Sequence, residues 1–107
     1  MYRDGSVTYS AVINFSASGS STVVGGVAGQ RINIMKLALV IAAATNLTFQ
    51  DASTPLTGAM SMLANGSIVL DCDGAPWYTT SVGNGFIINS SSAVQVSGSL
   101  QYQLVPG

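Results

Sequence analysis

The sequence predicts an all-β protein, an antiparallel, jelly-roll-like β-sandwich of about eight strands. Three observations predict this fold. Apolar and polar residues alternate along much of the chain, the expected strands recur about every ten residues, and clusters of Gly, Ser, Asn and Asp separate them. No long segment has the period of an amphipathic helix. The 107 residues suit one domain, which we expect over residues 7–107, after an N-terminal arm over residues 1–6.

The first half of the chain contains three expected strands. Residues 7–15 alternate apolar with polar side chains, with Val12 as the exception, and residues 22–24 form a short strand after a Ser/Gly turn over residues 16–21. Residues 30–43 are the longest candidate, and both of their faces are apolar. We therefore expect a central strand that is covered on both faces. One face would carry Met35, Leu37, Leu39 and Ile41, and the other Ile32, Ile34, Ala38 and Val40.

A helix is the alternative for residues 36–44, since Ala and Leu favour helices. The β-branched residues that frame this segment, and the missing helix caps, favour a strand.

The second half of the chain contains the remaining strands. Residues 46–50 form one, followed by a loop over residues 51–55. Asn65-Gly66 is a strong two-residue hairpin signal and should join residues 59–63 to residues 67–70. A loop over residues 71–77 leads to a short strand at residues 78–81. After a turn at residues 83–85, residues 86–89 form another strand, and residues 94–104 show the clearest alternation in the chain.

Several segments resemble small β-sandwich proteins encoded in tailed-phage genomes. They are residues 39–49 (LVIAAATNLTF), 54–58 (TPLTG), 63–70 (LANGSIVL), 74–77 (GAPW), 83–85 (GNG) and 92–98 (SAVQVSG), with Tyr102. The resemblance covers roughly residues 30–104, and its proteins are capsid decoration or cement proteins and fibre-associated modules. It implies a structural virion protein on the capsid exterior and brings no catalytic residues. We expect a homo-oligomer, a homotrimer, that stabilises the phage head by binding the major capsid protein at capsomer seams.

The composition excludes several classes of function. The chain has only seven charged residues, no His, no Glu and a single Cys. Three basic residues cannot form the cationic surface that nucleic-acid binding needs, and general acid–base catalysis lacks its usual residues. We therefore expect no enzyme, no cofactor, no metal site and no nucleic-acid partner. The longest apolar run has eight residues, whereas a membrane-spanning helix needs about 20, and the start of the chain lacks the apolar stretch of a signal peptide.

A few residues remain as candidate contacts. Trp77 and Tyr78 could form an aromatic platform for sugar or protein, or Trp77 could cap the end of the core. Asp71 and Asp73 could hold a calcium ion or imitate a pair of glycosidase carboxylates, although a solvated loop pair explains them better.

The N-terminal arm could carry Tyr2 and Arg3 onto a neighbouring subunit, and the uncharged last 34 residues could contact other subunits or the shell. A carbohydrate-binding receptor-recognition module in a fibre tip is the alternative function.

Overall fold

The computed structural model describes residues 8–71 and 77–106. The predicted arm over residues 1–6 lies outside these ranges, as does the centre of the loop predicted at residues 71–77. The described residues form ten strands and no helix. In chain order they are β1 (Thr8–Phe15), β2 (Gly19–Val24), β3 (Gln30–Ile41), β4 (Thr45–Asp51), β5 (Thr54–Pro55), β6 (Met60–Met62), β7 (Ser67–Leu70), β8 (Tyr78–Thr79), β9 (Phe86–Ser90) and β10 (Val96–Pro106).

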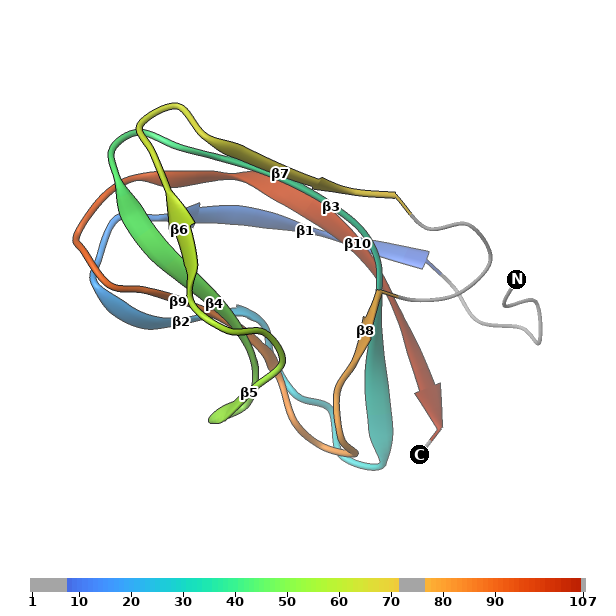
Figure 1. The fold of residues 1–107 in the computed structure, drawn as a ribbon. Coiled ribbons are helices and arrows are strands. Elements are labelled where there is room, and N and C mark those ends of the chain that lie inside the picture. Colours follow the sequence, from blue (N-terminus) through green and yellow to red (C-terminus); the bar gives the residue numbers. More distant parts are fainter. Residues whose placement is uncertain (1–7, 72–76, 107) are drawn as a thin grey trace.

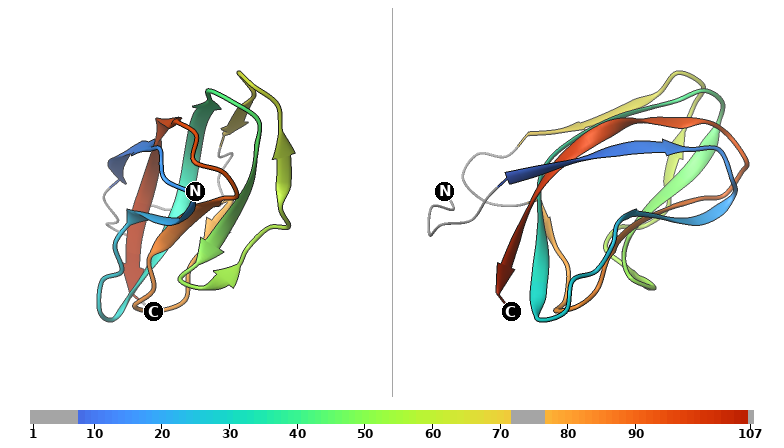
Figure 2. Two further views of the ribbon diagram at one scale, coloured as in Figure 1. Left: turned by 90° about the vertical axis from the view of Figure 1, so that its left-hand side faces the viewer. Right: turned by 180° about the vertical axis from the view of Figure 1, so that it is seen from behind.

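The strands form two antiparallel sheets that pack as a sandwich (Figure 1). Sheet A has the order β1-β10-β3-β7, and β8 pairs with β3 beside β7. Sheet B has the order β2-β9-β4-β5, and β6 pairs with β4 beside β5. Because β7 and β8 share one edge of sheet A, and β5 and β6 share one edge of sheet B, each sheet is four strands wide. Most connections carry the chain from one sheet to the other (Figure 2). This arrangement confirms the predicted jelly-roll-like sandwich.

The core lies between the two sheets and is built by alternation along the strands. Leu47 and Phe49 of β4, with Phe86 and Ile88 of β9, are fully buried on the inner face of sheet B. The inner face of sheet A contributes Ile13 of β1, Ile32, Ile34, Leu37, Leu39 and Ile41 of β3, and Val96 and Leu100 of β10. The alternation predicted for the first and last strands is thus realised, and a period of two is sufficient to build this core.

A β-bulge at Met35 corrects the expectation for the longest strand. Ile34 pairs with Tyr102 and Lys36 pairs with Gln101, so Met35 is one extra residue on β3. Because one extra residue reverses the in–out alternation, Ile32 and Ile34 face the same core as the three apolar residues that follow the bulge. The prediction that they lie on an opposite, covered face is wrong: that face carries the exposed side chains of Ala38 and Val40.

The Asn65-Gly66 signal predicts a turn correctly and its partner strands incorrectly. The amide of Gly66 donates to the carbonyl of Leu63 over 2.9 Å, and Asn65 has a φ of 62°, as the third residue of a type II turn requires. The strands on either side do not pair with each other. β6 pairs with β4 in sheet B, whereas β7 pairs with β3 in sheet A. The turn therefore carries the chain from one sheet to the other.

Strand boundaries differ from the prediction in a few further places. β2 begins at Gly19, within the predicted turn, and the loop after β4 contains the two-residue strand β5. The strand expected at residues 78–81 is limited to β8, and the last strand runs from Val96 to Pro106. Residues 36–41 belong to β3, which excludes the helix considered there.

Candidate interaction surface

The outer face of sheet A is a grid of exposed, mostly small side chains. Strand register brings them into rows across four strands. Val12, Ser99, Ala38 and Val69 form one row. We call the whole set the outer A face, which comprises Ser10, Val12 and Asn14 of β1, Ser97, Ser99 and Gln101 of β10, Lys36, Ala38 and Val40 of β3, Ser67 and Val69 of β7, and Asp71 directly after it.

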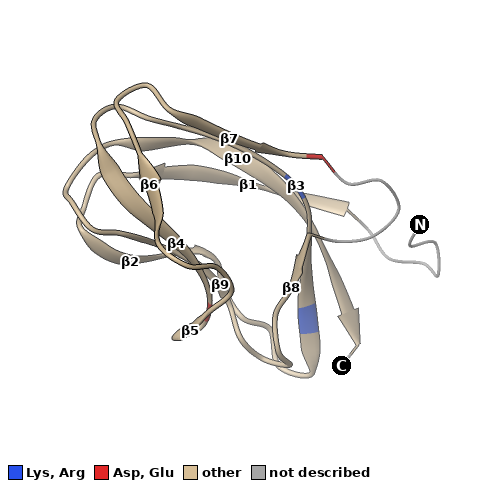
Figure 3. Ribbon diagram, in the orientation of Figure 1, with Lys and Arg blue, Asp and Glu red and all other residues tan. Residues whose placement is uncertain are grey.

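Within these twelve residues charge is limited to one ion pair; Arg31, also exposed on the outer side of β3, lies on the other side of the Met35 bulge. The ammonium nitrogen of Lys36 lies 3.5 Å from a carboxylate oxygen of Asp71, and both side chains are exposed. An exposed pair of this kind contributes about 0–1 kcal/mol to stability, so its main effect is to neutralise the face. Figure 3 shows that β1, β7 and β10 carry no charged side chain in the described residues.

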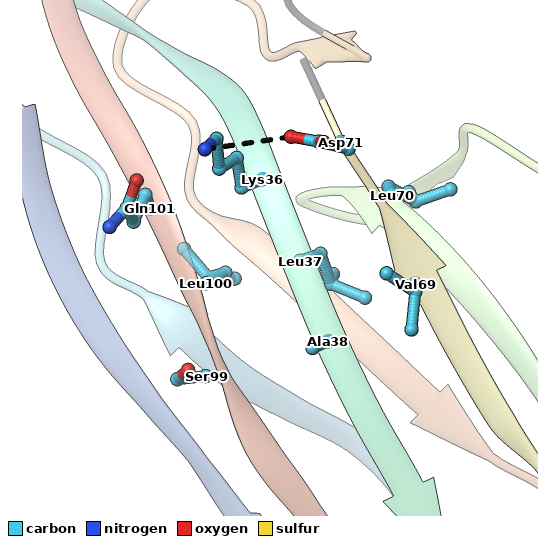
Figure 4. A pocket seen from close by; sticks show the side chains of 9 residues that line it. All are labelled: Lys36, Leu37, Ala38, Val69, Leu70, Asp71, Ser99, Leu100 and Gln101. Carbon is cyan, nitrogen blue, oxygen red and sulfur yellow. Dashed lines mark ion pairs between the residues drawn. The ribbon is translucent and has the colours of Figure 1, made fainter.

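The face is hollowed where its side chains are smallest. A shallow hollow of about 270 Å³ lies over β10, β3 and β7, between the Lys36–Asp71 pair, Val69 and Gln101 (Figure 4). Ala38 and Ser99 line it and leave room above the backbone. A second hollow of about 200 Å³ lies farther along β3 and β10, beside Val40 and Ser97. The face is thus uncharged overall and indented, with apolar side chains at its rim.

The outer face of sheet B has a different chemistry. The amide of Asn89 donates to the hydroxyl of Ser20 over 3.0 Å, and that hydroxyl donates to the amide oxygen of Gln50 over 3.2 Å. These bonds connect β9, β2 and β4 across the outside of the sheet. The outer side chains of sheet B are therefore partly hydrogen-bonded to one another. On the outer A face, Asn14 and Ser97 accept hydrogen bonds from the side-chain amide of Gln95, and four apolar side chains remain exposed: Val12, Val40, Val69 and Ala38.

Trp77 and Tyr78 are neighbours in the chain that have different surroundings. The amide of Trp77 donates to the carbonyl of Ile34 over 2.8 Å, and its side chain is 49% exposed. The ring of Tyr78 instead packs against the core, edge-on to Phe49 at 5.7 Å and stacked on Phe86 at 6.4 Å. Burial raises the pKa of the Tyr78 phenol above its ordinary value of 10.0. The exposed aromatic surface at this edge therefore belongs to Trp77.

The other predicted contact residues are placed as follows. Asp71 pairs with Lys36 at the edge of the outer A face. Asp73, Tyr2 and Arg3 lie outside the described residues. Contact roles for all of these residues, and for Trp77 and Tyr78, stay predictions. Within residues 8–71 and 77–106, no group of three or more His, Cys, Asp or Glu could hold a metal ion.

Apart from Asp71, the residues of the outer A face have no chemistry that distinguishes them in the sequence. Ser, Ala and Val are ordinary strand residues, and they come together only through the register of strands distant in the sequence. One signal did exist: Val12 interrupts the alternation of the first strand, and it is 76% exposed. Of the uncharged last 34 residues, Ser97, Ser99 and Gln101 belong to this face.

No helix in the part of the chain that the structure describes is long and apolar enough to cross a membrane. No family model and no curated protein sequence matches the chain. Among solved structures, the chain is similar to one described as "Cyanophage Pam1 capsid asymmetric unit". The TM-score is 0.48 and the sequence identity is 11%, over 98% of this chain and 90% of that chain.

Proposed function

We propose that the chain is a structural protein of a phage virion, a decoration or cement protein on the capsid exterior. It binds the major capsid protein at the seams between capsomers and stabilises the head. The observation that carries this function is the outer A face, twelve exposed side chains whose only two charges neutralise each other. The sequence segments that resemble tailed-phage decoration proteins point to the same class.

A face of this composition is suited to binding protein. The cores of protein interfaces are poor in charged residues, because an unpaired charge loses its hydration when it is buried. Ser, Ala and Val also lose little side-chain entropy when a partner immobilises them. The hollow between Val69 and Gln101 gives a protruding side chain of the partner a place to pack.

The stabilising mechanism is mass action. A seam is complete only when two capsomers lie side by side, so a protein that binds the seam binds the assembled shell better than its free parts. Each bound copy then lowers the free energy of the assembled state by RT ln(1 + [L]/Kd). Neither catalysis nor a cofactor is needed for this function.

Self-association is part of the proposed function. The net charge is only −1, so copies of the chain repel one another weakly. The homotrimer expected from the sequence stays a prediction, which the mass of the assembly tests.

A capsid-binding assay with a matched pair of variants tests the function. Purified heads that lack the protein are mixed with wild type, with Ser99→Lys in the outer A face, and with Ser61→Lys on β6 of sheet B; both serines are exposed. We expect Ser99→Lys to lower occupancy at least tenfold, because its ammonium would be buried without a partner, and Ser61→Lys to bind as wild type does. Equal binding by all three proteins would show that the outer A face does not contact the shell.

The alternative, a carbohydrate-binding module in a fibre tip, is favoured by the exposure of Trp77. A half-exposed Trp at a sheet edge can stack on a sugar ring. A glycan array with wild type and Trp77→Ala separates the two functions. Saturable binding that is lost in Trp77→Ala supports the module, and the absence of binding leaves the structural role ahead.

A further inference from the structure

The four edges of the two sheets are not equally protected against pairing with another strand. An edge strand exposes unpaired N–H and C=O groups, and proteins block such edges with short strands, bulges, prolines or charged residues. In sheet B, one edge is divided between β5, which ends in Pro55, and the three-residue β6. The other edge is β2, whose register with β9 is shifted between Thr22 and Val24.

The far edge of sheet A is also interrupted. It is divided between β7, which pairs with residues 37–40 of β3, and β8, which pairs with residues 33–34. The bulge residue Met35 lies between these two pairings, and the charged Lys36–Asp71 pair lies at the end of β7. A strand from another chain could therefore not follow this edge over a continuous length.

β1 has none of these protections. Its eight residues pair with β10 without any register shift, from Thr8 opposite Gln103 to Phe15 opposite Val96. The segment TYSAVINF contains no charged residue, no proline and no glycine. No described strand pairs with its other side, and Figure 2 shows it at the rim of sheet A. Since every second residue of an edge strand directs its N–H and C=O away from the sheet, β1 presents a ready template for one more strand.

We propose that two copies of the chain associate through β1: the strand pairs antiparallel with β1 of the second copy across a two-fold axis. The two A sheets then form one continuous sheet of twice the width. This contact goes beyond the proposed capsid role and does not depend on it. It also favours an even number of copies in place of the three expected from the sequence.

In one register, the side chains of β1 are complementary to those of β1 in the second copy. Directly opposite residues of an antiparallel pair lie on the same face, so the two cores stay on one side only if inward residues oppose inward residues. With Val12 opposite Val12 of the second copy, apolar residues oppose apolar ones and Ser10 opposes Asn14. With Ala11 opposite itself, Val12 would face Ser10. The Val12-centred register is therefore favoured, and it covers a side chain that is 76% exposed in the single chain.

The mass in solution is the first test. Light scattering on the purified 107-residue chain should give a multiple of two chains, each of 10.9 kDa. A Val12→Lys variant places two like charges opposite each other at the axis and should release monomers. The control is Val69→Lys, which lies in the same row of the outer A face but on another strand, and which should leave the dimer intact. A monomeric or trimeric wild type would overturn the proposal, as would a dimer that persists in Val12→Lys.

Cross-linking tests the register independently of stability. In a Cys72→Ser background, Val12→Cys should form a disulfide-linked dimer under mild oxidation, because the two residues face each other directly. Ser10→Cys should not, since its own copy lies four residues along the strand, about 13 Å away. Equal cross-linking of both variants would overturn the pairing. Capsid occupancy of Ser99→Lys is a separate measurement, so a failure of the dimer and a failure of the capsid role are distinguishable.

Discussion

Asp51 accepts two hydrogen bonds from Ser81 on a single carboxylate oxygen. The donors are the amide and the hydroxyl of Ser81, and both distances are 2.9 Å. Asp51 is buried at the end of β4, and Ser81 lies in the loop between β8 and β9. The next residue of the β4 turn, Ala52, donates its amide to the carbonyl of Gly85 in the same loop, over 3.0 Å. These contacts attach the loop that follows β8 to sheet B.

Removing the Asp51 carboxylate should destabilise the protein by about 2–3 kcal/mol, because hydrogen bonds to charged groups are among the stronger ones and the amide of Ser81 would lose its partner. Asp51→Asn can keep an oxygen in the accepting position and should cost about 1 kcal/mol. Denaturant unfolding of Asp51→Ala, Asp51→Asn and wild type measures this order. Equal stability of all three proteins would show that the carboxylate is unimportant there.

Deleting Met35 should prevent folding. The bulge residue sets the alternation of β3, and without it either the residues before it or those after it would turn their apolar side chains to solvent. Met35→Ala keeps the residue count and should cost about 1 kcal/mol. Circular dichroism and thermal unfolding of both variants check this expectation. A deletion variant with a wild-type melting curve would contradict the role given to the bulge.

Gly98→Ala should destabilise the sandwich by about 1–3 kcal/mol. A Cβ at this position would lie 2.7 Å from the Cα of Leu39 and would overlap the carbonyl oxygen of Ala38, so β10 would have to move away from β3. Gly58→Ala is the matched control, because a Cβ there meets nothing within 4 Å and the backbone needs no positive φ. If both variants unfold at the same denaturant concentration, the close approach of the two strands is not limiting.

Ionisation of Tyr78 should weaken the fold at alkaline pH. Burial raises the pKa of its phenol in the folded state, so above pH 10 the unfolded chain loses this proton while the folded protein retains it. The unfolded state then binds fewer protons, and stability falls as the pH rises. Tyr78→Phe keeps the ring against Phe49 and Phe86 and should reduce this loss. The free energy of unfolding of both proteins, measured from pH 9 to pH 11, gives the comparison, and parallel curves would contradict the assignment.

The sequence was sufficient for features that depend on local pattern. Alternation located β1 and β10, the turn at residues 83–85 marked the start of β9, and the Asn65-Gly66 pair located a turn. The sequence could not show that β3 bulges at Met35. A bulge is defined by the pairing with the partner strand, here β10, which has one residue fewer over the same length. The same limit explains the error about β3. Because apolar residues occupy both odd and even positions of this strand, the sequence predicted that a second layer covers its other face. In the structure, the extra residue Met35 turns the apolar side chains on either side of it into one core.

The candidate surface was less predictable than the fold. Val12, Ala38, Val69 and Ser99 have no distinctive chemistry, and they are brought together by the register of β1, β10, β3 and β7. Trp77 is an aromatic residue in a predicted loop, and the sequence leaves open whether it is exposed or caps the end of the core; in the structure it is half-exposed. The inward direction of Tyr78 could not be anticipated, since it depends on where β8 joins β3.

The position of β10 has a consequence for the synthesis of this protein. β10 leaves the ribosome after the other nine described strands, yet it lies second in sheet A, between β1 and β3. Until it emerges, β1 lacks its one described partner strand and β3 lacks one of its neighbours, so the nascent chain cannot close either strand into the sandwich. Pairing between strands that lie far apart in the sequence, such as β1 and β10, also slows folding. The row through Val12, Ser99 and Ala38 is therefore assembled only after β10 has been synthesised, and a nascent chain that still lacks β10 cannot form the outer A face.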